Sequence, residues 1–196
     1  MPSTPADPTS LPPPRTPFAA TASVLEGRDE YLAENGFTTD GYEAEWVVVS
    51  IFGVSFRTPS PERRRRALKF HDLHHVVTGF GTDLAGEAEI SAWELRRGLS
   101  RLGLFVGSIV LSVALLGLFV APRRTLRAWH ASRTKGPLGS RRSLFQTERD
   151  YESLLRMTVG ELRRELVVPE GGIASGSRGL HARAPKTPPG RSSPAL

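Results

Sequence analysis

The prolines of this chain lie mostly at its two ends. Seven of the sixteen fall in residues 1–17 and four in residues 185–194. Because proline lacks a backbone hydrogen-bond donor and favours extended conformations, neither end should form a packed element. We therefore expect a disordered tail over 1–17, a disordered basic tail over 170–196 and a single domain over 18–169. About 150 residues can bury a real core but are too few for two typical domains.

Apolar residues between the tails recur with helical spacing, and no alternating run is long enough to demand a sheet. The sequence therefore predicts an all-α fold, a single helical bundle domain. Helix starts are indicated by the capping boxes Ser23 with Glu26 and Thr158 with Glu161, by Ser60-Pro61-Glu62 and by the cap Asp83. Helix ends are indicated by Gly36 and by Gly79-Phe80-Gly81.

The segment around Trp46 is open to two interpretations. Asp40 with Glu43 signals the start of a helix that would run through Trp46–Phe52, and we adopt this interpretation. The β-branched residues Val47–Val49 and Ile51 would instead suit a short strand.

The net charge of +6 invites a nucleic-acid interpretation. No recognisable nucleic-acid-binding module accompanies it, and residues 171–196 carry four basic residues and no acid. We therefore expect no nucleic-acid partner; anionic lipid or an acidic substrate suits the remaining charge at least as well.

The absence of cysteine excludes disulfides and thiolate metal sites. Residues 1–17 resemble neither a secretory signal nor a transit peptide, so a cytoplasmic N-terminus is expected.

A candidate metal site follows from the motif H-D-x-x-H at residues 71–75. His71 and His75 are one helical turn apart on one face, a spacing that lets two imidazoles bind one ion. Glu87 and His75 are equidistant from Gly81, the predicted turn of a helical hairpin, so they should face each other. Two histidines and one carboxylate form a divalent-metal set that leaves a position open for water or substrate. Zinc is the ion we expect; iron suits the same ligands.

Asp72 is harder to place, because adjacent helical residues point about 100° apart. It could be a strained ligand, a residue that orients an imidazole, or an acid–base group beside the metal. The simpler alternative for the whole motif is a pair of half-buried polar histidines. We expect His74 and His130 to be surface histidines, and Asp83, Glu89 and Glu94 to be caps or solvated helix residues.

The motif and its surroundings resemble a known family. His71-Asp72-Leu73-His74-His75, eleven residues, then Glu87 reproduces the H-D-x-x-H-x11-E signature of the coenzyme Q biosynthesis protein 4 family, the metal-binding proteins of ubiquinone synthesis. The likeness covers roughly residues 37–168. Its further elements are Val76–Asp83, Gly86-Glu87, Ala128-Trp129, Arg133-Thr134-Lys135, Glu148–Glu152 and Glu161–Leu166.

The resemblance implies an all-helical fold and a divalent ion held by His71, Asp72, His75 and Glu87. It also implies a polyprenylated hydroxybenzoate as substrate, with loss of the carboxylate and hydroxylation of the same ring carbon, at the membrane face and in a complex with other quinone-biosynthesis proteins. We expect Asp72 to be the catalytic residue, a ligand that also shuttles a proton. The alternative from another class is a non-catalytic scaffold that binds prenyl lipid. Self-association is left open.

Residues 102–121 are twenty residues without a charge, flanked by Arg101 and Arg123-Arg124. At a rise of about 1.5 Å per residue they would cross a bilayer core of about 30 Å. We expect a core helix beside a lipid groove in a peripheral protein on the cytoplasmic side of the membrane. Partial insertion, or a small integral membrane protein anchored by 102–121, is the alternative. Arg63–Arg66 oppose the dipole of their own helix, so they form either a solvated rim or a contact for anionic headgroups or an acidic substrate.

Overall fold

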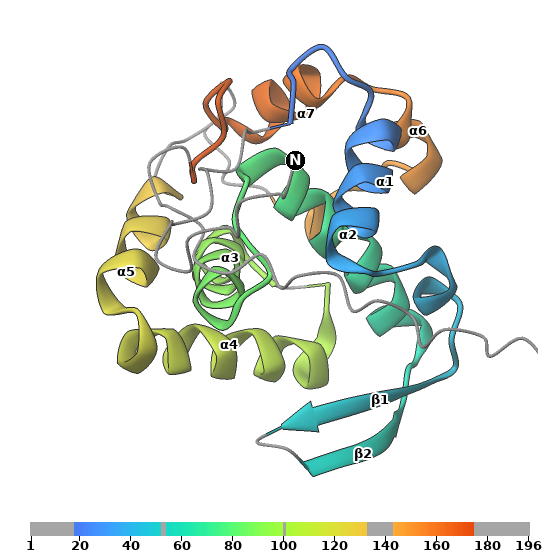
Figure 1. Cartoon of the computed structure of the whole chain (residues 1–196), viewed down its shortest axis with the longest axis vertical. Coiled ribbons are helices and arrows are strands. Elements are labelled where there is room, and N and C mark those ends of the chain that lie inside the picture. The colour runs from blue at the N-terminus through green and yellow to red at the C-terminus, as the bar shows by residue number, and fades with distance from the viewer. Residues whose placement is uncertain (1–17, 52–53, 100, 133–142, 175–196) are drawn as a thin grey trace, which may run out of the picture.

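The computed structural model describes residues 18–51, 54–99, 101–132 and 143–174. The tail predicted over 1–17, and residues 175–196 of the other predicted tail, lie outside the described residues. The described chain is predominantly helical, which confirms the all-α fold class (Figure 1). Its helices are α1 (Val24–Asn35), η1 (Thr39–Tyr42), α2 (Glu62–Thr78), α3 (Leu84–Arg97), α4 (Gly103–Val120), α5 (Pro122–Ala131), η2 (Leu144–Gln146), α6 (Tyr151–Leu155) and α7 (Val159–Leu166).

The predicted helix through Trp46–Phe52 is wrong. Strands β1 (Trp46–Ile51) and β2 (Val54–Pro59) form an antiparallel hairpin there, in which Trp46 pairs with Pro59 and Ile51 with Val54. Asp40 instead lies within the short 3-10 helix η1, whose N-cap is Thr38 and whose C-cap is Glu43. A run of β-branched residues loses side-chain freedom in a helix and suits an extended backbone, which accounts for the difference. The hairpin lies at the edge of the helical body, below α4 in Figure 1.

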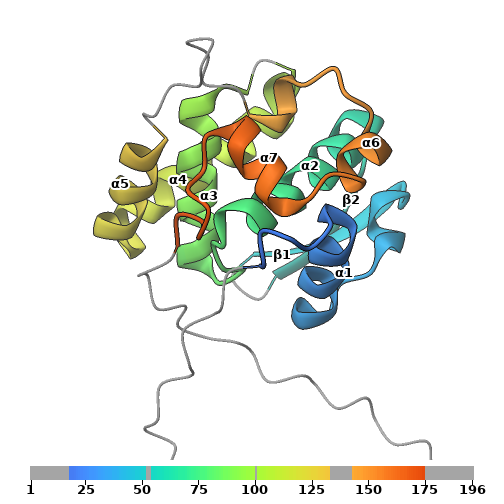
Figure 2. The ribbon, with the colours of Figure 1, turned by 90° about the horizontal axis from the view of Figure 1, so that it is seen from above.

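The predicted helix boundaries are confirmed at several positions. Ser23 with Glu26 and Thr158 with Glu161 form complete capping boxes at the starts of α1 and α7. These two helices lie beside each other in Figure 2, and Ser23 pairs with Thr158 in an isolated β-bridge. Because Gly79 adopts a left-handed φ of 77°, α2 ends there and the chain can turn back into α3.

The predicted C-terminal tail begins too early. Residues 170–174 still contact the domain, since the backbone N–H groups of Ile173 and Ala174 both donate to the carbonyl of Thr78. Thr78 ends α2, where carbonyls have no partner within the helix, so this contact satisfies a helix end. The last described residues therefore belong to the folded domain.

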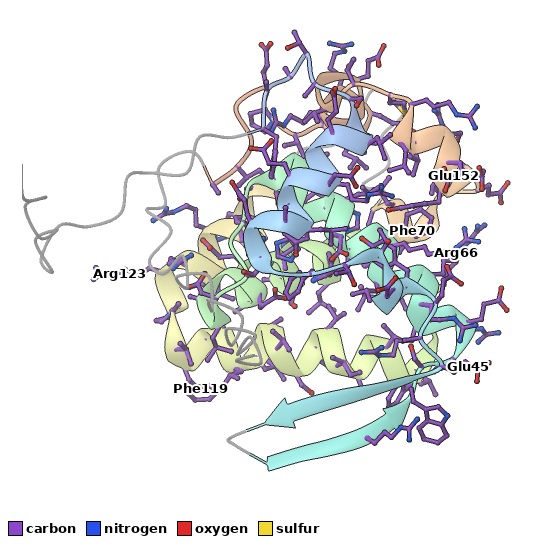
Figure 3. The ribbon with its side chains drawn as sticks, turned by 45° about the vertical axis from the view of Figure 1, so that its right-hand side comes forward. Glu45, Arg66, Phe70, Phe119, Arg123 and Glu152 are labelled. Atoms are coloured by element: carbon purple, nitrogen blue, oxygen red, sulfur yellow. The ribbon has the colours of Figure 1, made fainter. Side chains whose placement is uncertain are left out.

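By its length and composition alone, helix α4 is long and apolar enough to cross a membrane. It is not the core helix expected from the sequence. Its buried face consists of Val106, Val110, Ala114 and Gly117, while most of its other residues are exposed. The buried face packs on α3, and the opposite face is directed outward; Figure 3 shows Phe119 pointing away from the body.

Candidate metal centre

Helices α2 and α3 bring His71, His75 and Glu87 together, as the hairpin argument predicts. The Nε2 atoms of the two histidines are 3.2 Å apart. Glu87 places Oε2 3.3 Å from Nε2 of His71 and Oε1 3.4 Å from Nε2 of His75. Asp83 caps α3, its Oδ1 accepting from the N–H of Gly86, and so fixes the helix start from which Glu87 projects.

The outer nitrogen of each imidazole has its own partner. Nδ1 of His75 lies 3.0 Å from the carbonyl oxygen of Phe80, and Nδ1 of His71 lies 2.8 Å from Oε1 of Glu94. A carbonyl and a carboxylate only accept hydrogen bonds, so both Nδ1 atoms carry a proton. Tyr31 stacks on the His75 ring at 5.2 Å between centroids and further restricts its orientation. Both imidazoles therefore present Nε2 to Glu87.

These three side chains fit a metal ion. For bonds of about 2.0–2.1 Å in a tetrahedral arrangement, two donor atoms are about 3.3–3.4 Å apart. The two Nε2 atoms are 3.2 Å apart, and each lies 3.3 or 3.4 Å from a different oxygen of Glu87, so each of these separations is close to that edge length. With one ligand atom taken from each residue, the three atoms lie within 4.8 Å of one another. Metal-binding histidines also typically donate their other N–H to a carboxylate or a backbone carbonyl, the two partners found here. The group His71, His75 and Glu87 could therefore hold a metal ion.

Opposite charges dominate the electrostatics of the group. Burial disfavours the charged form of Glu87, but His75 and His71 outweigh it and hold the pKa of this carboxyl well below its usual range. Burial likewise opposes a charge on His71, yet Glu94 and Glu87 raise the pKa of this imidazole well above its usual value. The site thus favours a cation between the imidazoles and Glu87, either a proton or a metal ion.

Asp72 is not part of this group. It is buried, and its Oδ2 accepts a hydrogen bond of 2.6 Å from the hydroxyl of Tyr42 in η1. Burial raises the pKa of Asp72, with the nearby His71 acting in the opposite direction. The structure therefore places Asp72 beside the candidate centre, and its role as a ligand stays a prediction.

Two residues of the site were assigned to the surface by the sequence argument, and both assignments are wrong. His74 and Glu94 are each 0% exposed, and Nδ1 of His74 lies 2.7 Å from Oε1 of Glu94. A signal existed for Glu94, which follows Glu87 by seven residues, two helical turns, and so lies on the same face of α3. His74 gave no comparable signal, because its partners come from α3 and from the distant segment at Leu144.

The remaining candidate residues lie outside the metal group. Glu89 is buried rather than solvated, because Nη2 of Arg124 donates to its Oε2 at 2.6 Å and links α5 to α3. Asp83 is the predicted cap, and His130 is exposed as expected. Within Arg63–Arg66 the side chains range from partly buried to exposed, and Arg64 and Arg65 bond locally to Ser60.

Comparisons with known proteins identify no relative. No family model, no curated protein and no solved structure matches this chain. The resemblance to the coenzyme Q biosynthesis protein 4 family therefore rests on the motif and its flanking residues alone.

Proposed function

We propose that this protein binds one divalent metal ion, zinc in the first place and iron as the alternative, through His71, His75 and Glu87. The observation that carries the proposal is that two Nε2 atoms and a carboxylate converge while both outer imidazole nitrogens are hydrogen-bonded. Two histidines that only formed a hydrogen bond with each other would not need these hydrogen bonds at their Nδ1 atoms. A bound ion would supply Lewis acidity that stabilises negative charge developing on a substrate.

We further propose, from the family resemblance, that the site acts on a polyprenylated hydroxybenzoate of ubiquinone synthesis. The bond between the ring and its carboxylate breaks, and a bond between the same ring carbon and a hydroxyl oxygen forms. The balanced reaction consumes the acid, dioxygen, two electrons and two protons, and yields the phenol, carbon dioxide and water. The electrons come from a two-electron reductant outside this chain.

Asp72 is the residue we assign to proton transfer in this reaction. It adjoins His71 in sequence, is buried, and has a raised pKa because of that burial. A carboxyl that holds its proton more tightly can donate and regain it closer to neutral pH. The hydroxyl of Tyr42 holds one carboxyl oxygen of Asp72 in place.

We also propose that the outward face of α4 rests on the surface of an anionic membrane. Leu104 is 94% exposed and Phe119 is 85% exposed, at opposite ends of the helix. Exposed arginines lie beyond both ends, Arg101 before α4 and Arg123 after it, the latter labelled in Figure 3. An apolar helix face with basic flanks is typical of a helix that lies in the bilayer interface.

The packing of α4 favours this position over a membrane crossing. Its buried face contacts α3, which carries the ionisable residues Glu87, Glu89 and Glu94. A crossing α4 would either take these groups into the bilayer or separate from α3, and both are costly. A helix lying flat keeps its contact with α3 and covers its apolar face with lipid.

Elemental analysis and zinc titration test the metal proposal. Wild-type protein should bind one equivalent of zinc, and His75→Ala should lose stoichiometric binding, because one of three ligands is removed. The exposed His130 supplies the matched control, so His130→Ala should bind as wild type does. Full occupancy of His75→Ala would exclude the proposed site.

Flotation with lipid vesicles tests the membrane proposal. Wild-type protein should float with phosphatidylglycerol-containing vesicles and be released from native membranes by alkaline carbonate. Leu104→Ser combined with Phe119→Ser should abolish flotation, whereas Phe37→Ser, an exposed aromatic residue after α1, should not. Resistance to carbonate would instead indicate an integral membrane protein.

A further inference from the structure

One buried carboxylate oxygen contacts two histidines. Oε1 of Glu94 lies 2.8 Å from Nδ1 of His71 and 2.7 Å from Nδ1 of His74. Glu94 and His74 are completely buried, whereas His71 is partly buried. The carboxylate therefore connects the candidate metal ligand His71 to a histidine outside the metal group.

The hydrogen bond that His74 accepts on its other ring nitrogen determines the direction of its hydrogen bond to Glu94. The backbone N–H of Leu144, at the start of η2, donates to Nε2 of His74 over 2.9 Å. An N–H can only donate, so Nε2 of His74 is unprotonated and its Nδ1 carries the proton. His74 therefore donates to Glu94, and the backbone of η2 fixes which tautomer of His74 does so.

The surroundings of Glu94 offer its carboxylate few polar partners besides the two histidines. Among the described residues, its Oε2 is buried and has no hydrogen-bond partner. His74 is enclosed by aromatic edges, with ring centroids 5.1 Å from Trp93 and 4.9 Å from Phe145. Burying a carboxylate in such a site costs free energy, and its contacts with the two imidazoles offset this cost.

We propose that Glu94 is a positioning residue of the metal centre, which holds His71 with its proton on Nδ1 and its Nε2 lone pair directed at the ion. His74 and the N–H of Leu144 hold Glu94 in turn. The inference rests on the proposed metal function and extends the centre beyond the H-D-x-x-H and Glu87 motif. The hydrogen bond to a carboxylate also makes the imidazole a stronger donor to the ion.

Zinc affinity is the first test, measured with zinc alone by competition against a chromogenic chelator. Glu94→Gln keeps the size of the side chain but removes its charge, and it should weaken zinc binding about 10- to 100-fold with one equivalent still bound at saturation. Glu89→Gln is the matched control, a second buried glutamate on α3 whose partner is Arg124. It should lower thermal stability and leave zinc affinity unchanged.

The outcomes separate this inference from the metal proposal. If wild type binds zinc and Glu94→Gln binds it equally well, Glu94 is not a positioning residue while the metal site stands. If wild type binds zinc no better than His75→Ala, the metal proposal fails and the inference falls with it.

A spectroscopic measurement on wild-type protein keeps the inference testable if Glu94→Gln does not fold. Nitrogen-15 NMR of the zinc-loaded protein should assign the His71 proton to Nδ1 and the metal bond to Nε2. The hydrogen-bonded Nδ1 proton should resonate far downfield and exchange slowly with solvent. Zinc on Nδ1 of His71, or a rapidly exchanging Nδ1 proton, would overturn the role of Glu94.

Discussion

The hydroxyl of Tyr42 donates a hydrogen bond of 2.6 Å to Oδ2 of Asp72, thirty residues further along the chain. Both residues are buried, and Tyr42 comes from η1, the short helix that leads toward the hairpin. The contact occupies one oxygen of the only acidic residue in the H-D-x-x-H motif. The role of Asp72 in proton transfer can therefore be tested separately from metal binding.

Asp72→Asn should therefore leave zinc stoichiometry unchanged and reduce product formation by about 10²- to 10⁴-fold, the usual contribution of a general acid or base. The asparagine carbonyl can still accept from Tyr42, so the fold should be retained. Product formed from a prenylated hydroxybenzoate is measured by mass spectrometry, and zinc by elemental analysis. Asp40→Asn, an exposed carboxylate in η1, is the control.

Two outcomes would contradict this assignment. Loss of zinc from Asp72→Asn would make Asp72 a ligand, as the family resemblance implies. Normal product formation with normal zinc content would leave Asp72 without a chemical role and would favour the lipid-binding scaffold.

Two glycines of α4 give a matched pair for the contact between α4 and α3. A Cβ at Gly117 would lie 2.4 Å from Cβ of Ala88 and 2.6 Å from Oγ1 of Thr125, whereas nothing lies within 4 Å of a Cβ at Gly107. Gly117→Ala should therefore destabilise the protein by about 1–3 kcal/mol through overpacking. Gly107→Ala should stabilise it by about 0.5–1 kcal/mol, because alanine is the better helix former.

Urea unfolding of the two variants, in the same detergent-free buffer, measures this difference. Equal effects at the two positions would show that α4 does not pack closely on α3. In that case the packing of α4 on α3 would no longer disfavour a membrane crossing by α4.

Local signals predicted much of the fold. The capping boxes at Ser23 and Thr158, the stop at Gly79 and the cap at Asp83 depend on residues within a few positions of each other, so the sequence suffices to find them. The spacing of Glu87 about Gly81 correctly placed it opposite His75, because a short turn constrains both helices. The hairpin was missed because a helix start signal and a β-branched run compete over the same residues.

The outer parts of the site depend on contacts far apart in sequence. The partner of His74 at Leu144 is seventy residues away, and that of Asp72 at Tyr42 is thirty. No sequence periodicity links such positions. Without knowledge of its burial, His74 could only be interpreted as a surface residue beside the two candidate ligands. Glu94 is the intermediate case, since its helical phase relative to Glu87 is visible but its burial is not.

Arg163 is a second residue whose role no local pattern indicates. Its guanidinium donates to the carbonyls of Val76 and Val77 at the end of α2 and to those of Phe18 and Glu170. Hydrogen bonds to a charged group contribute about 1.5–3 kcal/mol each, so Arg163→Met should lower the free energy of unfolding by at least about 3 kcal/mol. Urea unfolding measures the loss.

The neighbouring Arg164 is exposed on the same helix and serves as the control. Arg164→Met should change stability by less than about 0.5 kcal/mol. Similar losses in both variants would mean that positive charge on α7, rather than the four carbonyl contacts, stabilises the domain.

The capping box of α7 makes a prediction about pH. The N–H and the hydroxyl of Thr158 both donate to Oε2 of Glu161, and these hydrogen bonds lower the pKa of Glu161 from its usual 4.5. A carboxyl whose pKa is lower in the folded state stabilises the fold above the unfolded pKa and loses that contribution as the pH falls through the folded pKa. The stabilisation is therefore complete at neutral pH and disappears in acid.

Glu161→Gln should consequently be less stable than wild type at neutral pH, and the difference should close as the pH is lowered below the usual pKa of the carboxyl. Urea unfolding of both proteins from neutral pH to the lowest pH at which each still folds measures the difference. Glu165→Gln removes an exposed carboxylate from the same helix outside the capping box. If it reproduces the pH dependence, net charge is the cause, because a cap acts only through the carboxylate that accepts from Thr158.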